Sequence, residues 1–452
     1  MKIIIVGAGK AGFAIAEQLS AEGHDVTVID NRPDQLSAVT DTLDVISMEG
    51  NGCSFETLEE AGAEDADVLI AATGRDEVNI VSCAAARHLG AKSTLARIKD
   101  PEYTRQRERL REGFGIFSVF NPDLEAASEI SRILQFPTAA RVETFAKGRA
   151  ELVEYRIPAG SELVGITLAQ LPKRFRARVL VCAVERSGEI IIPNGGFVLQ
   201  AGDRLSIAGA RTQLRSFFIR VKAYKKPVRS VMLLGGSFIA VYLARQLMEA
   251  GIRVTLIERN EARCKQLCGL LPRASIRCGD ATRREVLQEE GLGMTDAVVA
   301  LTGFDEDNLI LSMYAGSCGV GKVVTKVSEE HFALMLQNSG IDCFVCPKLL
   351  AAQQIVQYVR ALDNAAGSSV ESLYRLVDGK VEALQFVVGA RSRCAGRALR
   401  DLVTWPDVLV GAVIQDGICR IPDGDTVLNE GDRAVVVTTR SGLRDLDAIL
   451  ES

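Results

Sequence analysis

The sequence predicts an α/β protein of two tandem Rossmann-like units, each a doubly wound parallel sheet followed by a small α+β module. Two observations predict this class. Short apolar runs alternate with helical stretches at the start of each half, as in parallel sheets covered by helices on both faces. The whole pattern then recurs once within the 452 residues. A chain of this length exceeds one compact core, so several domains are expected.

The first half shows the alternation most clearly. Ile3–Val6 is a strand-like run, Lys10–Ala21 has helical spacing, and Asp25–Ile29 is a β-branched run that ends at Asp30. A further strand-like run, DVLIAATG, ends at Thr73-Gly74, and a helix follows it. This βαβαβ order indicates a parallel sheet. Near Pro122, and again near Pro347, a long helical stretch leads into short strands with Gly-Asp turns, which indicates a small α+β module.

The internal repeat sets out the domains. TGRDEVNIVSCAAA from Thr73 aligns with TGFDEDNLILSMYA from Thr302, and IPNGGFVLQAGDRLSIAG from Ile192 aligns with IPDGDTVLNEGDRAVVVT from Ile421. The polar, basic stretch Lys222–Ser230, with Pro227, interrupts the apolar pattern and indicates a linker. The predicted domains are a nucleotide-binding domain at 1–137, a small module at 138–222, a second N-type domain at 228–365 and a second small module at 366–452.

Composition narrows the range of partners. The net charge of −5 provides no overall attraction to nucleic acid or to an anionic membrane surface, so no nucleic-acid partner is expected. No secretory signal or run of about 18 to 20 apolar residues is seen, which favours a cytosolic protein that reaches a membrane through a protein partner. Among the 11 cysteines, only Cys343 and Cys346 have a metal-like spacing. A zinc site needs two more ligands than the neighbouring sequence offers, so we favour a structural role and expect no metal.

The stretch Gly7-Ala8-Gly9-Lys10-Ala11-Gly12 predicts a nucleotide site. This GxGxxG follows a strand, opens a helix and is followed by Asp30 at the end of the next strand, which is the context that makes the motif specific. The glycines permit a tight turn, close approach of a pyrophosphate and close helix packing, and the helix N-terminus offers free N–H groups. Asp30 would accept hydrogen bonds from ribose hydroxyls, which favours NAD(H), ADP or ATP over NADP(H), although Arg32 is of a type that accommodates a 2′-phosphate.

Three further positions are candidates for this site. Thr73-Gly74 ends a strand at the carboxyl edge of the sheet, where ribose and phosphates would lie. Arg97 would reach the phosphates with its guanidinium group or would be an ordinary surface arginine. Asn51, within Gly50-Asn51-Gly52, would contact the adenosine or would belong to a simple turn.

The second copy of the motif has diverged. Gly235 and Gly236 keep the turn, but Ser237 replaces Gly9 and is followed by Phe238, and Ala240 replaces Gly12. Glu258 and Lys326 replace Asp30 and Arg97, and Thr302-Gly303 repeats Thr73-Gly74. The Cβ of Ser237 would crowd a pyrophosphate. The second site is therefore expected to be weaker, altered in ligand choice or empty, as in a protein that senses nucleotide in one half and assembles or transmits through the other.

Catalytic machinery is not apparent in the sequence. The three histidines, His24, His88 and His331, lie in no constellation with nucleophile or carboxylate spacing, and no phosphate-loop lysine motif is present. Lys99 and Asp100 are the only acid or base candidates near the predicted site. These features favour a non-enzyme, and an NAD-dependent oxidoreductase with an unrecognised substrate site remains the alternative.

The first half resembles the RCK N (KTN) domain that regulates potassium transport, and four stretches carry this resemblance: the opening segment, the GNG turn, AATGRDEVNI and ARIKDPEY. The two IP…GDR segments resemble the RCK C module. Two such pairs in tandem resemble the TrkA family of peripheral, NAD-binding subunits of bacterial Trk potassium-uptake systems. The resemblance implies a cytosolic protein that assembles into a ring of its own copies. It also implies that the protein binds NAD(H) or adenine nucleotide and gates a potassium-translocating membrane subunit.

Overall fold

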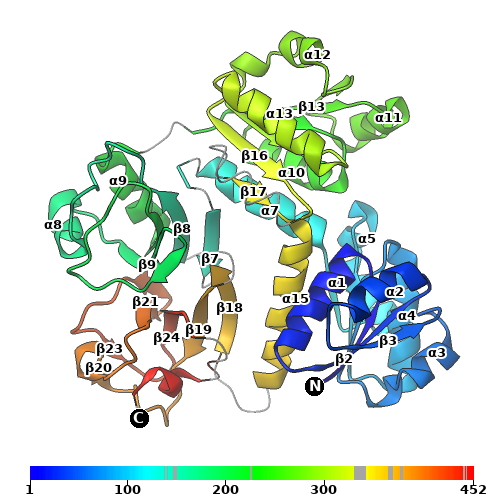
Figure 1. The fold of residues 1–452 in the computed structure, drawn as a ribbon, viewed down its shortest axis with the longest axis horizontal. Helices are drawn as coiled ribbons and strands as arrows, with labels where there is room; N and C mark the ends of the chain where they lie inside the picture. Colours follow the sequence, from blue (N-terminus) through cyan, green and yellow to red (C-terminus); the bar gives the residue numbers. More distant parts are fainter. Residues whose placement is uncertain are drawn as a thin grey trace. The chain divides into compact units, whose positions relative to one another are not determined.

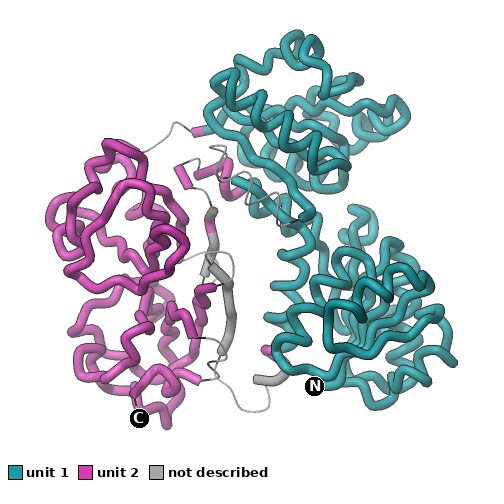
Figure 2. The backbone as a smooth tube through the Cα atoms, viewed as in Figure 1, with its two compact units in different colours: residues 1–131, 228–359 teal, residues 132–227, 360–452 magenta. Residues whose placement is uncertain are grey.

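The structure is a computed structural model that describes residues 1–136, 138–139, 141–145, 150–223, 227–329, 343–364, 370–376, 380–440, 443 and 445–451. Parts of three predictions lie outside the described residues: linker residues 224–226, the boundary residues 137 and 365–366, and His331. The chain forms two compact units, one of residues 1–131 and 228–359 and one of residues 132–227 and 360–452 (Figure 2). The two N-type domains therefore belong to one unit, and the two small modules belong to the other.

The first N-type domain is a six-stranded parallel sheet with the order β3-β2-β1-β4-β5-β6 (Figure 1). Its strands are β1 (Lys2–Val6), β2 (Asp25–Asp30), β3 (Ile46–Glu49), β4 (Val68–Ala71), β5 (Ser93–Arg97) and β6 (Ser118–Phe120). Its helices are α1 (Lys10–Ala21), α2 (Pro33–Thr40), α3 (Phe55–Glu60), α4 (Asp76–Leu89), α5 (Pro101–Arg105), α6 (Arg107–Phe114) and α7 (Pro122–Gln135). Ile3, Ile4 and Ile5 of β1 are fully buried, as expected for a central strand covered on both faces.

The second N-type domain repeats this sheet with the order β14-β13-β12-β15-β16-β17. Its strands are β12 (Ser230–Leu234), β13 (Arg253–Glu258), β14 (Ser275–Cys278), β15 (Ala297–Ala300), β16 (Lys322–Lys326) and β17 (Phe344–Val345). Its described helices are α10 (Phe238–Glu249), α11 (Glu261–Leu270), α12 (Arg284–Glu289), α13 (Asp305–Ser317) and α15 (Pro347–Asn364). Within the described part of the chain, no helix is both long and apolar enough to cross a membrane.

The small modules are antiparallel sheets with the orders β10-β9-β11-β8-β7 and β18-β19-β24-β21-β22. The first contains β7 (Arg141–Phe145), β8 (Ala150–Arg156), β9 (Leu180–Arg186), β10 (Glu189–Ile191), β11 (Arg204–Gly209), α8 (Leu171–Phe175) and α9 (Arg211–Arg220). The second contains β18 (Val370–Leu376), β19 (Val381–Val387), β20 (Arg397–Ala398), β21 (Val408–Gln415), β22 (Ile418–Arg420), β23 (Val427–Leu428) and β24 (Arg433–Thr438). Buried residues of both modules, including Leu152, Cys182, Val381 and Val437, form one shared core. The predicted fold class is thus confirmed.

Polar contacts join the two N-type domains inside their unit. The hydroxyl of Tyr242, on α10, lies 2.9 Å from the Lys99 carbonyl oxygen and 2.9 Å from the Thr104 hydroxyl, and it accepts a hydrogen bond from the Asn121 amide at 3.1 Å. Gln246, one turn further along α10, donates to the Ser128 hydroxyl at 3.0 Å. The helix that begins at the second glycine loop therefore packs against the first domain.

Candidate functional site

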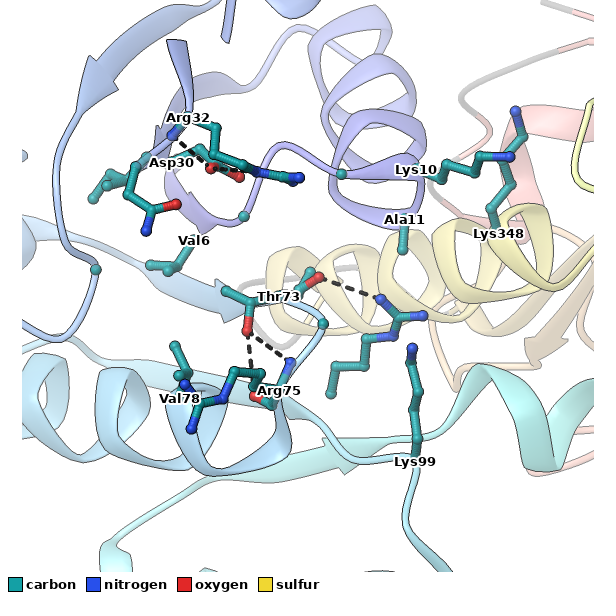
Figure 3. A pocket seen from close by; sticks show the side chains of 18 of the residues that line it. Val6, Lys10, Ala11, Asp30, Arg32, Thr73, Arg75, Val78, Lys99 and Lys348 are labelled. Atoms are coloured by element: carbon teal, nitrogen blue, oxygen red, sulfur yellow. Dashed lines mark hydrogen bonds and ion pairs between the residues drawn. The ribbon is translucent and has the colours of Figure 1, made fainter. Parts of the chain in front are cut away.

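A cavity with a volume of about 1020 Å³ lies beside the first glycine loop. It opens at the carboxyl ends of β1 and β4, where the strand order of the first sheet reverses and where open α/β sheets bind ligands. The lining includes Gly7, Gly9, Lys10, Ala11, Asp30, Arg32, Asn51, Thr73, Gly74, Arg97, Lys99, Asp123, Ile239, Lys326, Ser328 and Lys348. Figure 3 shows Asp30 and Arg32 toward one end of the glycine loop and Lys10 and Lys348 toward the other.

The three glycines of the first loop differ in the space that surrounds them. Gly7 has a φ of 106°, which side chains other than glycine rarely adopt, and a Cβ there would press on the backbone of Ala72 and Thr73. A Cβ at Gly12 would collide with the carbonyl oxygen of Gly7. Gly9 differs, because a Cβ there would meet nothing within 4 Å. Gly9 therefore keeps space free on the cavity side, at the start of α1, which has no side-chain cap.

Asp30 links the end of β2 to this loop. One carboxylate oxygen accepts a hydrogen bond from the Ala8 amide at 2.7 Å, and the other accepts one from the Arg32 amide at 3.0 Å. Asp30 is only 8% exposed, yet it lines the cavity. Ala8 and Gly12 themselves lie behind the lining and are buried.

A buried asparagine, Asn79, fixes two residues that line the cavity, Thr73 and Arg97. The Asn79 side chain accepts hydrogen bonds from the Thr73 amide at 2.9 Å and from the Thr73 hydroxyl at 2.7 Å, and it donates to the Arg97 carbonyl at 2.8 Å. It thereby joins the ends of β4 and β5. Asn308 repeats this arrangement with Thr302 and Lys326. Neither asparagine is among the residues that the sequence predicts for the site, although the repeated TGxDExN pattern contains both.

Of the residues that the structure describes, seven cationic side chains and two carboxylates line the cavity. Its cations are Lys10, Arg32, Arg75, Arg97, Lys99, Lys326 and Lys348, and its carboxylates are Asp30 and Asp123. Such an excess attracts an anionic ligand. The Nε of Arg97 is buried and has no hydrogen-bond partner among the described residues, while its Nη1 donates to the Ala72 carbonyl at 3.3 Å.

Burial shifts the pKa values of three charged groups that line the cavity. Burial, followed by the charge of Arg97, lowers the pKa of Lys99. Burial likewise lowers the pKa of Lys326. It raises the pKa of Asp123, although Lys99, Arg97 and Lys326 oppose that shift. Cations that are crowded and partly desolvated would gain stability from a multiply charged anion.

The second glycine loop is organised differently. Ser237 has nearly the backbone conformation of Gly9, with φ and ψ of −66° and 173° against −67° and −179°. Its hydroxyl accepts a hydrogen bond from the Ala240 amide at 3.3 Å and so caps α10. Glu258 reaches the loop as Asp30 does, accepting from the Gly236 amide at 2.7 Å. A Cβ at Gly236, where the first loop has Ala8, would lie 2.6 Å from Cδ1 of Leu267 and 2.9 Å from the Glu258 carboxylate.

Arg263 covers this second loop from α11. Its Nε donates to the Gly236 carbonyl at 2.8 Å, and its guanidinium carbon lies 5.5 Å from the centre of the Phe238 ring. The loop's carbonyl and the first aromatic residue of α10 are therefore both engaged by the protein itself.

The cavity beside the second loop is small and acidic. Its volume is about 190 Å³, below the roughly 300 to 1,000 Å³ of typical ligand pockets. Gly235, Glu258, Thr302 and Gly303 line it, whereas Gly236, Ser237, Phe238 and Lys326 do not. Its charged lining residues are Glu258, Asp280, Asp307 and Arg259. Lys326, which the sequence pairs with the second loop, faces the first cavity instead and donates to the Thr302 carbonyl at 2.6 Å.

Other candidates from the sequence have local structural partners. Asp100 caps α5 by accepting from the Glu102 amide at 2.7 Å. Asn51 lines the cavity and also accepts from the Cys53 amide at 3.1 Å within its turn. Cys343 and Cys346 are buried, and the described residues contain no group of three or more potential metal ligands.

Sequence comparison adds a family assignment. The TrkA-N domain profile matches residues 3–122 and 231–347, and the TrkA-C domain profile matches residues 152–219 and 383–451. The Trk system potassium uptake protein TrkA homolog of Archaeoglobus fulgidus is 33% identical over 99% of this chain and 100% of its own length. Trk system potassium uptake protein TrkA of Vibrio alginolyticus is 32% identical over 100% of this chain and 99% of its own.

Two solved structures share the fold. The GsuK channel bound to NAD superposes with a TM-score of 0.63 over 97% of this chain and 76% of that chain, at 18% identity. The GsuK RCK domain gives a TM-score of 0.63 over 96% of this chain and 92% of its own, also at 18% identity. The two profile matches together cover most of the sequence, and full-length relatives exceed 30% identity. The chain therefore belongs to the TrkA family, with two TrkA-N and two TrkA-C domains in alternation.

Proposed function

We propose that this chain is a cytoplasmic regulatory subunit that binds NAD(H) or an adenine nucleotide and gates a potassium-translocating membrane protein. The observation that carries the proposal is the first cavity, in which a glycine loop, Asp30 and an excess of cations meet at the switch point of the sheet. The names of the full-length relatives, which are potassium uptake proteins, supply the transport context.

The residues present fit a dinucleotide. The open space at Gly9 and the uncapped start of α1 would receive a pyrophosphate. The buried Nε of Arg97, which has no hydrogen-bond partner in the described part of the chain, offers a donor for a phosphate oxygen. Asp30 would accept from ribose hydroxyls, and its charge disfavours a 2′-phosphate. In this role the nucleotide acts as a ligand that shifts conformation, and it undergoes no reaction.

Coupling between the halves follows from where the cavity lies within its unit. Lys326 and Ile239 of the second N-type domain line it together with residues of the first, and Tyr242 bonds to the backbone of Lys99. A ligand that contacts Lys99 and Lys326 together would favour one arrangement of the two domains. Such differential binding shifts the equilibrium, typically by about 1 to 3 kcal/mol. The less open second loop would transmit the change or hold nucleotide weakly.

We further propose that the protein turns over no substrate. Lys99, which has a lowered pKa and faces the cavity, is the best candidate base. Its neighbours Arg97 and Lys326, however, form a cation cluster of the kind that binds phosphates, and Asp100 is engaged in capping α5. NADH should therefore stay unoxidised beside a panel of carbonyl substrates, and ATP should stay intact. Steady consumption that is lost in Lys99→Ala would favour the oxidoreductase alternative.

The regulatory proposal places the chain at the inner face of the cell membrane, attached through its partner and assembled as a ring of identical copies. The decisive experiment reconstitutes a Trk-type potassium-translocating protein in liposomes and measures rubidium uptake with and without this chain. We expect uptake to depend on the chain and to respond to NADH or ATP, and Gly9→Ser to lose the nucleotide response. Uptake that ignores both the chain and the nucleotide would reject the proposal.

A further inference from the structure

One carboxylate of the second N-type domain holds two lysines at the rim of the first cavity. Glu329 lies 3.3 Å from the Nζ of Lys10 through Oε1 and 3.1 Å from the Nζ of Lys348 through Oε2. Lys10 is the first residue of α1, and Lys348 is the second residue of α15. Figure 3 shows these two lysines side by side beyond the start of α1. The carboxylate therefore bridges cations from both domains next to the uncapped helix terminus.

The backbone around Glu329 is fixed by a buried acid. Asp305 accepts hydrogen bonds from the Ser328 amide at 2.6 Å and from the Glu329 amide at 3.2 Å. Burial alone would raise the pKa of Glu329, but its hydrogen bonds to Lys348 and Lys10 outweigh burial and hold that pKa below its usual value. The side chain is thus ionised at neutral pH and anchored at its base.

The first half uses the corresponding residue differently. Asp76 holds the amides of Lys99 and Asp100, as Asp305 holds those of Ser328 and Glu329, so Asp100 is the counterpart of Glu329. The Asp100 side chain caps α5 within its own domain. The longer side chain, in the second half, reaches a cation of the other domain, Lys10.

We propose that Glu329 is an internal competitor for the phosphates of the nucleotide, occupying Lys10 and Lys348 until a ligand replaces it. The proposal rests on the nucleotide function proposed above and concerns the regulation of that same site. A diphosphate at the start of α1 would lie beside Lys10, because this is where the free N–H groups and the helix dipole favour negative charge. Binding would transfer Lys10 from the carboxylate to a phosphate. Ligand occupancy would thereby exchange a contact between the domains for a contact with the ligand.

The test is a calorimetric titration of the full chain with NADH and with ADP. Glu329→Gln keeps the shape of the side chain and removes its charge, and we expect it to bind both ligands about 2- to 30-fold more tightly, the range that two partly exposed ion pairs imply. Glu290→Gln is the matched control, because Glu290 pairs at 2.8 Å with Arg277 in the same domain, and Arg277, unlike Lys10 and Lys348, does not line the first cavity. It should bind as the unmodified chain does.

A double-mutant cycle separates direct competition from a general change of charge. In a Lys10→Gln background, Glu329→Gln should improve binding much less than it does in the unmodified chain. An equal improvement in both backgrounds, or unchanged or weaker binding by Glu329→Gln alone, would overturn the proposal while leaving the nucleotide function intact. Failure of the unmodified chain and of every variant to bind NADH or ADP would reject the nucleotide function itself.

Discussion

Replacing Gly9 with serine should weaken nucleotide binding without harming the fold. The second loop shows what the change does, because Ser237 has the same backbone conformation and its hydroxyl accepts from the Ala240 amide. A serine at position 9 would likewise engage the Gly12 amide, which would no longer be free for a phosphate. One charge-assisted hydrogen bond is worth roughly 1.5 to 3 kcal/mol, so the affinity for NADH should fall about 10- to 150-fold.

Stability should respond differently from binding. A Cβ at Gly9 meets nothing within 4 Å, and serine caps a helix at least as well as glycine. The free energy of unfolding should therefore change by no more than a few tenths of a kcal/mol. Calorimetric titration with NADH and a thermal melt without ligand measure the two effects separately. Gly9→Ala is the control, because it adds the Cβ without the capping hydroxyl. NADH affinity within threefold of the unmodified chain in Gly9→Ser, or a loss of binding that accompanies unfolding, would refute this reasoning.

Three other predictions follow from the same contacts. Asp30→Ala should weaken NADH binding more than NADPH binding, which paired titrations measure. It should also cost about 1 to 3 kcal/mol of stability in denaturant melts, because it leaves the buried Ala8 amide without its acceptor. The pKa of Lys99 lies below the ordinary lysine value of about 10.4, and NADH affinity should fall as pH rises through it, because the anion favours the protonated amine. Lys99→Arg should move that fall to higher pH. An unchanged pH profile in this variant would contradict the assignment. Tyr242→Phe should destabilise the chain by about 1 to 3 kcal/mol in denaturant melts, because the Asn121 amide loses a buried acceptor.

Local sequence was sufficient to predict the two parallel sheets. The runs at Ile3–Val6 and Asp25–Ile29 carry enough β-branched, apolar character to specify buried strands, and the strand-turn-helix context locates the Gly7 turn. The structure also places Asp30, Thr73 and Arg97 around one cavity. These residues come together because each follows or ends a parallel strand, and the carboxyl ends of such strands meet at one edge.

What the sequence could not reveal depends on how distant segments pack. Lys326 was assigned to the second loop by its place in the repeat, but the pairing of the two N-type domains turns it toward the first cavity. Asp123 and Lys348 reach the same cavity from the starts of α7 and α15, and no local motif marks them. The expected effect of Ser237 was steric crowding, whereas the structure adds a capping hydrogen bond that depends on the exact placement of the Ala240 amide.

The measurement that tests the central claim most directly is the stoichiometry of NADH binding to the unmodified full chain. The first cavity is large and cationic, whereas the second is small and acidic, and the loop beside it is engaged by the capping hydroxyl of Ser237 and by Arg263. Calorimetric titration should therefore show one tight site per chain, with any second site at least about tenfold weaker, a difference of about 1.4 kcal/mol. Ser237→Gly should strengthen only the weak site. Two sites of equal affinity in the unmodified chain would contradict the unequal roles assigned to its halves.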